Sequence, residues 1–164
     1  MIQQKICLLG SFSVGKTSLI RRYVDSLFSD KYLTTVGVKI DKKHLCVADQ
    51  AYSLMLWDIA GEDDFTSIRT AYLRGMSGYI IVIDPTRPHS YETALSIHDM
   101  VKTSIGHLPA VFALNKADIK NTWQLDTPQH QHLHQFGYPV VETSAKQGLG
   151  VEAMFLQLIQ QWGH

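Results

Sequence analysis

The chain has 164 residues, with 15 lysines and arginines balanced by 15 aspartates and glutamates. This length suits one domain with its own core, so we expect residues 1–164 to form a single domain. The balanced charge argues against a protein that binds nucleic acid through a broad basic surface. No apolar run in the sequence is long enough to span a bilayer.

The cysteines and the chain ends bear on cellular location. Cys7 and Cys46 show neither pairing nor metal-binding spacing and lie in apolar stretches, so we expect buried free thiols in a reducing cytoplasm. The final residues, LIQQWGH, carry no cysteine for prenylation and no polybasic tail. Either the protein is soluble without a direct lipid anchor, or an anchoring segment belongs to a longer chain.

Apolar residues recur along the chain at strand and helix spacings. In chain order, the predicted elements are a strand over 2–9, a helix over 16–27, a loop over 28–37, strands over 38–47 and 52–58, a buried strand over 78–84, a helix over 90–105, a buried strand over 110–115, a helix over 127–136, a strand over 138–142 and a helix over 149–161. Ser90 and Thr127 are expected to cap their helices, with Pro128 in the first turn. The alternation predicts an α/β fold with a mostly parallel sheet, which binds ligands at the carboxyl ends of its strands.

Residues 10–17 read Gly-Ser-Phe-Ser-Val-Gly-Lys-Thr and lie between the first predicted strand and helix. This is the P-loop pattern, in which backbone N–H groups and a helix N-terminus surround a phosphate. Lys16 would place a cation beside the β- and γ-phosphates, and Thr17 would offer a hydroxyl to Mg²⁺. The residues expected to bind the phosphates are Ser13, Val14, Gly15, Lys16, Thr17 and Ser18. By itself, the pattern does not separate ATPases, kinases and GTPases.

A second group of residues points to the metal. Asp58 closes an apolar strand and suits a Walker B carboxylate, which holds Mg²⁺ through water. The alternative is an aspartate that caps the turn before Gly61. Upstream, Thr34 and Thr35 lie in a loop before a strand, where a hydroxyl could complete the Mg²⁺ shell when a γ-phosphate is present.

Two further segments follow buried strands and suit the base. In Asn115-Lys116-Ala117-Asp118, the Asp118 carboxylate could accept hydrogen bonds from guanine N1–H and N2–H₂, a donor pair that adenine lacks. Lys116 could lay its alkyl stem along the base. In Glu-Thr-Ser-Ala-Lys, residues 142–146, backbone N–H groups could reach guanine O6. The candidate base-binding residues are Asn115, Lys116, Asp118, Ser144, Ala145 and Lys146. Each tetrad alone suits an ordinary polar turn, but their order beside a P-loop favours a guanine-nucleotide site.

With these motifs in order, the chain resembles the small GTPases of the Ras superfamily, most closely the Rab branch. The segments TTVGV, WDIAG, AYLRGMSGYIIVID, NKAD and ETSAK carry the resemblance. It implies a P-loop G domain with a six-stranded, mostly parallel sheet and five helices. It also implies a molecular switch that binds GTP or GDP with Mg²⁺ and hydrolyses GTP. A monomer is expected, with two switch loops that contact effector, exchange-factor and activating proteins.

The resemblance also assigns residues by position. Thr35 matches the switch threonine that binds Mg²⁺, Phe28 the aromatic ring that packs against guanine, and Gly61 the glycine whose N–H meets the γ-phosphate. The metal-binding residues are then Thr17, Thr35 and Asp58. The residues implied in catalysis are Lys16, Thr35, Gly61 and Glu62.

Two positions depart from the family pattern. Glu62 stands where the family usually has a glutamine that orients the attacking water, and an ionised glutamate lacks the amide donor and adds negative charge. Phe12 stands where the P-loop usually has a small residue, and its ring could crowd a partner's arginine finger. Both predict weak hydrolysis. The alternatives are a GTP-binding interaction module with little or no hydrolysis and, opposed by NKAD and ETSAK, a P-loop kinase or ATPase.

Overall fold

A computed structural model describes residues 1–24, 31–33, 38–60 and 70–163 of the chain. The strands are β1 (Ile2–Leu9), β2 (Lys31–Leu33), β3 (Val38–Val47), β4 (Gln50–Ile59), β5 (Gly78–Ile83), β6 (Ala110–Leu114) and β7 (Val140–Glu142). The helices are α1 (Lys16–Val24), α2 (Pro88–Ser104), α3 (Thr127–His134) and α4 (Val151–Gln160), with short 3₁₀ helices η2 (Thr70–Leu73) and η3 (Ala117–Thr122). None of the helices in these ranges is long and apolar enough to cross a membrane.

The strands form one sheet in the order β2-β3-β4-β1-β5-β6-β7. β1 pairs in parallel with β4 and β5, and the parallel pairing continues through β6 to β7. β3 runs antiparallel to β4 and β2. The predicted α/β fold with a mostly parallel sheet is therefore confirmed, with all six expected strands present. The edge strand β2 is an addition where a loop was expected, because three residues are too few to show an alternating pattern.

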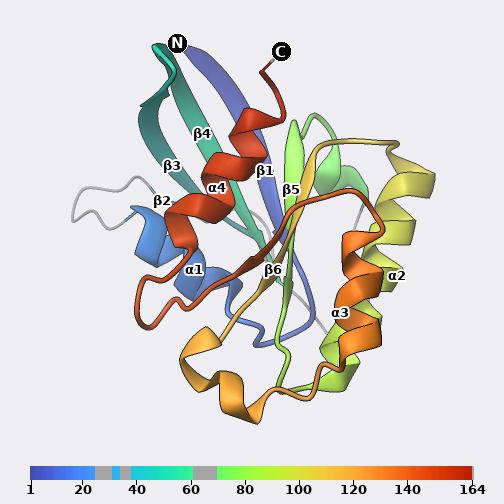
Figure 1. The fold of residues 1–164 in the computed structure, drawn as a ribbon. Coiled ribbons are helices and arrows are strands. Elements are labelled where there is room, and N and C mark those ends of the chain that lie inside the picture. Colours follow the sequence, from blue (N-terminus) through green and yellow to red (C-terminus); the bar gives the residue numbers. More distant parts are fainter. Residues whose placement is uncertain (25–30, 34–37, 61–69, 164) are drawn as a thin grey trace.

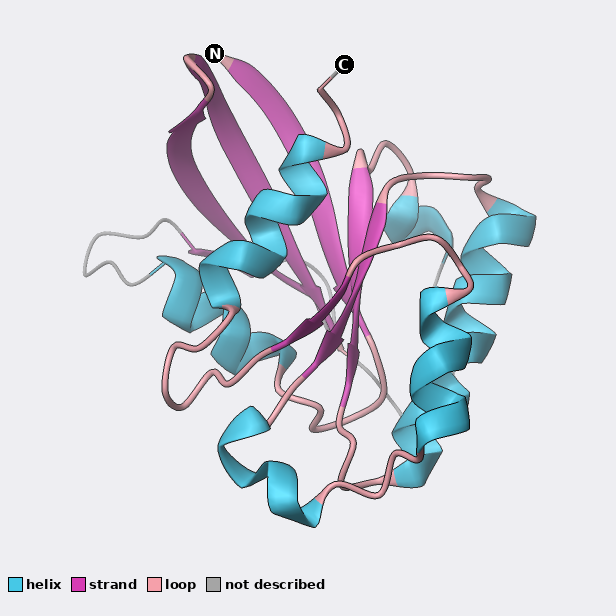
Figure 2. Ribbon diagram, viewed as in Figure 1, coloured by secondary structure: helices cyan, strands magenta, loops and turns pink. Residues whose placement is uncertain are grey.

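Helices cover both faces of the sheet, α1 and α4 on one and α2 and α3 on the other (Figures 1 and 2). β1 shows how one strand serves both layers. Ile6 and Leu8 pack toward α1 and α4, whereas Cys7 and Leu9 pack toward α2. Burial on both faces explains the continuous apolar runs of the central strands. The loops after β1, β5 and β6 gather at the end of the sheet opposite the chain termini (Figure 1).

The prediction that Ser90 caps α2 is wrong. The helix begins at Pro88, and Arg87 is its extended N-cap residue. A proline suits the first helical turn because its fixed φ is helical and its missing N–H needs no partner there. The Ser90 hydroxyl instead donates to Asp84 O at 2.6 Å and accepts from Asp84 N at 3.0 Å. Ser90 therefore ties the helix to the end of β5.

The prediction that Thr127 caps α3 is wrong by one residue. Asp126 is the N-cap, and its Oδ1 accepts the Gln129 backbone N–H at 2.8 Å. The Gln129 side chain in turn accepts the Asp126 N–H at 3.1 Å, which completes a capping box. The Asp126 carboxylate accepts a free N–H group at the start of the helix, which is the role expected of Thr127. Thr127 and Pro128 are instead the first two residues of the first turn.

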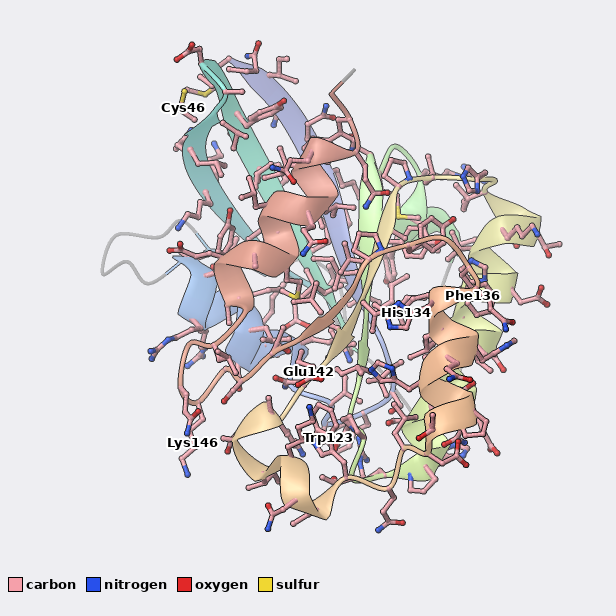
Figure 3. The ribbon with its side chains drawn as sticks, in the orientation of Figure 1. Cys46, Trp123, His134, Phe136, Glu142 and Lys146 are labelled. Carbon is pink, nitrogen blue, oxygen red and sulfur yellow. The ribbon has the colours of Figure 1, made fainter. Side chains whose placement is uncertain are left out.

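The two cysteines lie in different environments. Cys7 is buried as expected, and burial raises the pKa of its thiol to about 12. The prediction that Cys46 is buried is wrong, because it is exposed near the end of β3 (Figure 3). Its neighbours Leu45 and Val47 pack against the core cluster that includes residues of α1 and α4, so strand alternation turns Cys46 to the opposite face of β3.

Candidate functional site

The loop from Gly10 to Gly15 connects β1 to α1 and requires glycine at both ends. A Cβ on Gly10 would lie 2.6 Å from Val82 O, and a Cβ on Gly15 would lie 2.2 Å from Asn115 Nδ2. Both residues also have positive φ angles, 152° and 105°, which side chains disfavour. The glycines of the predicted P-loop are therefore required by close packing at the carboxyl edge of the sheet.

Lys16 is a buried cation inside this loop. Its Nζ donates to Gly10 O at 3.2 Å and to Ser11 O at 3.1 Å. Burial lowers the pKa of Lys16 to about 8, an effect that the charge of Asp58 opposes and that of Arg87 increases. An ammonium held by carbonyl groups in this way gains a stronger partner when a phosphate enters the loop.

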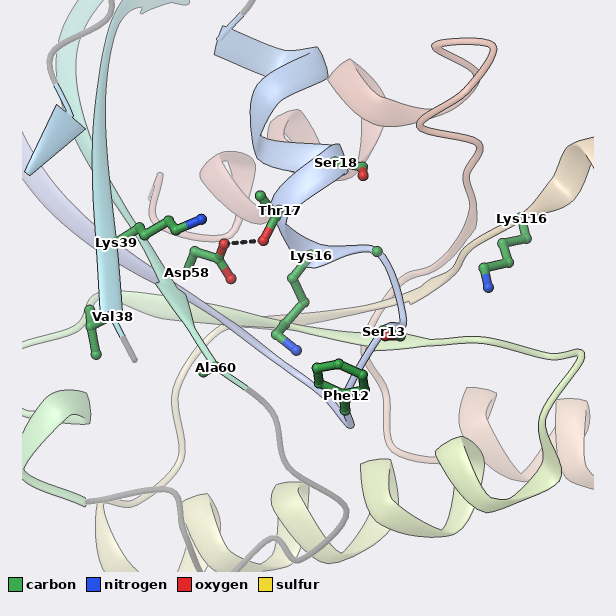
Figure 4. Close-up of a pocket in the computed structure, with 11 residues that line it drawn as sticks. Phe12, Ser13, Lys16, Thr17, Ser18, Val38, Lys39, Asp58, Ala60 and Lys116 are labelled. Carbon is green, nitrogen blue, oxygen red and sulfur yellow. Dashed lines mark hydrogen bonds between the residues drawn. The ribbon is translucent and has the colours of Figure 1, made fainter. Parts of the chain in front are cut away.

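Thr17 and Asp58 meet at the metal-binding side of the loop. The Thr17 hydroxyl donates to Asp58 Oδ2, as the dashed line in Figure 4 shows. The parallel register of β1 and β4 pairs Leu8 with Asp58, which places the carboxylate beside the P-loop. Hydroxyl and carboxylate oxygens suit Mg²⁺, which usually takes few protein ligands and completes its shell with phosphates and water. Across the described ranges, no three His, Cys, Asp or Glu side chains gather into a metal cluster.

Two cavities lie side by side at this edge. One of about 590 Å³ adjoins the P-loop, with Lys16 and Phe12 opposite Asp58 and Lys39 (Figure 4). It is lined by Phe12, Ser13, Gly15, Lys16, Thr17, Ser18, Val38, Lys39, Asp58, Ala60 and Lys116. The other, about 610 Å³, is lined by Gly15, Ser18, Asn115, Lys116, Asp118, Ile119, Ala145 and Lys146. They share Gly15, Ser18 and Lys116, so a ligand with phosphates and a base could occupy both.

Asn115 connects the P-loop to the loop after β7. Its Nδ2 donates to Val14 O at 2.9 Å, and its Oδ1 accepts from the Thr143 hydroxyl at 3.1 Å. The Val14 side chain itself is buried in the core, so only its backbone is available to a phosphate. Asn115 therefore acts on a nucleotide through the loops that it joins as well as through its position beside the base cavity.

The Asp118 carboxylate is held from behind at the base cavity. The hydroxyl of buried Ser144 donates to Asp118 Oδ1 at 2.8 Å, and Ala117 N donates to Thr143 O at 2.9 Å. These contacts join the segments 115–118 and 142–146, which the sequence motifs predicted to form one site. Ala145 and Lys146 line the same cavity.

Lys116 lies between the two cavities and has a left-handed backbone conformation, with φ 70°. Its ammonium lies 2.7 Å from Asp84 Oδ2, and its carbonyl accepts the Trp123 indole N–H at 3.0 Å. Burial alone would raise the pKa of Asp84, but hydrogen bonds from Lys116 and Thr86 outweigh it and lower that pKa below its usual value.

Four predicted site residues, Phe28, Thr35, Gly61 and Glu62, lie outside the described residues. Three residues at the site were missed by the sequence reasoning. Lys39 lines the phosphate cavity. Asp84 accepts from Lys116, and Arg87 donates to the P-loop carbonyl of Phe12. Asp84 had a detectable signal, because it is a carboxylate that ends an apolar strand as Asp58 does.

Comparisons with known proteins agree with this geometry. A family model described as the Ras family matches residues 5–163. The Ras-related protein Rab7 of Drosophila melanogaster is 37% identical over 158 residues, covering 92% of this chain and 76% of its own. The Ras-related protein Rab-3C of Bos taurus is 33% identical over 157 residues, covering 94% of this chain and 69% of its own. The Ras-related protein Rab-3 of Caenorhabditis elegans is also 33% identical, covering 95% of this chain and 72% of its own.

Proposed function

Because this chain belongs to the Ras family and is similar to its Rab members, we propose that it is a guanine-nucleotide switch that binds GTP or GDP with Mg²⁺ and hydrolyses GTP slowly. The observation that carries this proposal is the pair of adjoining cavities, one beside a P-loop lysine and the other beside a fixed carboxylate. A base and a chain of phosphates fit that arrangement together.

Asp118 selects the base in this proposal. Its carboxylate accepts the N1–H and N2–H₂ donors of guanine, whereas adenine offers no such donor pair to the side of the carboxylate that faces the base. The Ser144 hydroxyl already occupies Oδ1 and fixes the plane of the group. Ala145 and Lys146 supply backbone N–H groups near the base, and Phe28 packs against it.

Lys16 and the P-loop backbone bind the phosphates. The buried ammonium exchanges its carbonyl partners for phosphate oxygens, which are stronger acceptors. Thr17 and Asp58, with Thr35, would hold Mg²⁺, which supplies positive charge beside the β- and γ-phosphates. Gly61 offers a backbone N–H to the γ-phosphate only when GTP is bound.

Two side chains support slow hydrolysis. Glu62 lacks the amide donor that orients the attacking water and adds repulsion near the γ-phosphate. Phe12 is 62% exposed at the rim of the phosphate cavity, where its ring stands in the way of an approaching side chain. The same two residues favour the second candidate function, a GTP-binding interaction module with little or no hydrolysis. Single-turnover hydrolysis of bound GTP separates the two.

Partners follow from the switch proposal. Effector, exchange-factor and activating proteins are expected to read the loops that contain Thr35 and Gly61. The single G domain over residues 1–164, the monomeric state and the cytoplasmic location remain predictions.

The nucleotide itself is the first test. Purified protein is denatured, and the released nucleotide is identified by chromatography; GDP or GTP is the expected product. In a separate assay on native protein, GTP should displace a bound fluorescent guanine nucleotide far better than ATP does. Equal competition by GTP and ATP, or release of an adenine nucleotide, would contradict the proposal.

A further inference from the structure

A buried carboxylate joins two cations from different loops of the site. Asp84 follows β5 and is fully buried. Its Oδ2 lies 2.7 Å from the Lys116 ammonium and 3.2 Å from Arg87 Nε. Lys116 belongs to the base-binding loop, whereas Arg87 precedes α2. One carboxylate oxygen therefore links the base side of the site to the start of α2.

Arg87 extends this link to the P-loop. Its Nη2 donates to the carbonyl oxygen of Phe12, 75 residues away in the sequence. Nε and Nη2 are separate donors on one planar guanidinium, so the side chain bonds Asp84 and Phe12 at the same time. A lysine has one compact ammonium group and lacks this fixed fork.

The backbone holds Arg87 in a fixed turn. Arg87 N donates to Asp84 O at 2.9 Å, and Thr86 N donates to Asp84 Oδ1 at 3.0 Å. Pro88 follows directly, and a proline restricts the residue before it to an extended conformation, which Arg87 has. The guanidinium is therefore presented to the P-loop by a rigid segment.

Holding the Phe12 carbonyl also orients the next N–H group. The carbonyl of Phe12 and the N–H of Ser13 belong to one planar trans peptide and point in opposite directions. In the same way, Asn115 holds the Val14 carbonyl and orients the N–H of Gly15. Both N–H groups belong to residues that line the phosphate cavity.

We propose that Arg87 is a positioning residue that fixes the Phe12–Ser13 peptide for phosphate binding and couples it through Asp84 to Lys116. This inference rests on the proposed nucleotide function and concerns the same site. It assigns to Arg87 a role in binding the β-phosphate, with no direct contact to the base.

The test compares Arg87→Ala and Arg87→Lys with Arg21→Ala, which removes an exposed guanidinium from α1. For each protein, the release rate of fluorescent GDP, the ratio of GDP to GMP affinity and the melting temperature are measured with Mg²⁺. Arg87→Ala should release GDP about tenfold faster and lose a similar factor in the GDP-to-GMP ratio, as expected for one charge-assisted hydrogen bond. Arg87→Lys should fall between it and wild type, and Arg21→Ala should match wild type.

Several outcomes would overturn the inference. An unchanged release rate in Arg87→Ala, or an equal loss of GDP and GMP affinity, would assign Arg87 a structural role only. Full recovery in Arg87→Lys would show that charge suffices and that the fork is not used. A wild-type protein that binds no guanine nucleotide would instead contradict the proposed function and this inference together. Wild-type GDP binding with an unaffected Arg87→Ala would contradict the inference alone.

Discussion

At the scale of single residues, Asp118 owes its position to Ser144. The hydroxyl of Ser144 donates to Oδ1 at 2.8 Å, so the carboxylate cannot turn freely to suit another base. A polar group that a bound ligand buries without a hydrogen-bond partner costs on the order of 1–3 kcal/mol, and more when it is charged. Base selection is therefore expected to depend on this one side chain.

Asp118→Asn should move the preference from guanine to xanthine nucleotides. The new amide can donate to xanthine O2, where guanine carries a donor of its own. Competition of GTP and XTP against a fluorescent nucleotide measures the change. Asp99→Asn, an exposed change on α2, is the matched control and should keep the guanine preference. An Asp118→Asn protein that still prefers GTP would argue against this role of Asp118.

Glu62→Gln should hydrolyse GTP faster than wild type. The variant regains an amide donor for the attacking water and loses a negative charge near the γ-phosphate. Wild type is expected at or below the unaided rate of Ras, about 3–5 × 10⁻⁴ s⁻¹. Single-turnover assays on Mg·GTP-loaded protein measure both rates, and nucleotide affinity should change little. A slower Glu62→Gln variant would identify Glu62 as a positive catalytic group acting as a general base.

At the scale of secondary-structure elements, the start of α3 depends on its capping box. Asp126→Ala should lower the free energy of unfolding by about 1 kcal/mol, because the Gln129 N–H loses its acceptor. Urea denaturation measures the loss. Asp126→Asn keeps an acceptor and should be close to wild type. If it is as unstable as Asp126→Ala, the carboxylate charge and not the cap would be the stabilising feature.

The contact between α2 and β6 should make stability depend on pH. His98 lies among the rings of Phe112, Phe136 and Tyr138. Burial lowers the pKa of His98, Lys102 and His107 lower it further, and Asp99 opposes them. Its folded-state pKa is therefore below the unfolded value of about 6.5. The stability from neutral His98 is complete above that pH and is lost as the pH falls below it.

His98→Gln should reduce this acid sensitivity. The slope of the unfolding free energy against pH is measured by urea denaturation between pH 7 and 5. Each proton taken up on unfolding contributes at most about 1.4 kcal/mol per pH unit. His89→Gln, at an exposed position of the same helix, is the control and should keep the wild-type slope. An unchanged slope in His98→Gln would assign the acid sensitivity to other groups.

At the scale of the whole molecule, nucleotide state should be read by two segments far apart in the sequence. If Thr35 and Gly61 contact the γ-phosphate side only in the GTP form, residues 29–40 and 60–74 should change protection after hydrolysis. Hydrogen exchange with GDP and with a non-hydrolysable GTP analogue measures this, with β6 as an internal reference. Thr35→Ala should keep GDP binding and weaken the GTP-specific protection. Identical protection in both states would argue against a switch.

Local signals sufficed for most of the fold and for the main site motifs. Continuous apolar runs predicted β5 and β6, because strands covered on both faces need apolar residues throughout. The P-loop pattern was readable because its glycines are required by backbone geometry that few other residues tolerate. The base-binding segments were recognised by their order and by their positions after buried strands.

Only the tertiary structure decided the contacts between distant segments. The bonds from Arg87 to Phe12 and from Lys116 to Asp84 span 75 and 32 residues. No local periodicity encodes them, because they depend on which strand ends the sheet order brings together. Packing also decided the environment of Cys46: its apolar neighbours Leu45 and Val47 suggested burial, but they pack against the core while Cys46 is exposed. The sequence by itself determined the elements and the chemistry of the loops, and packing decided which side chains hold those loops in place.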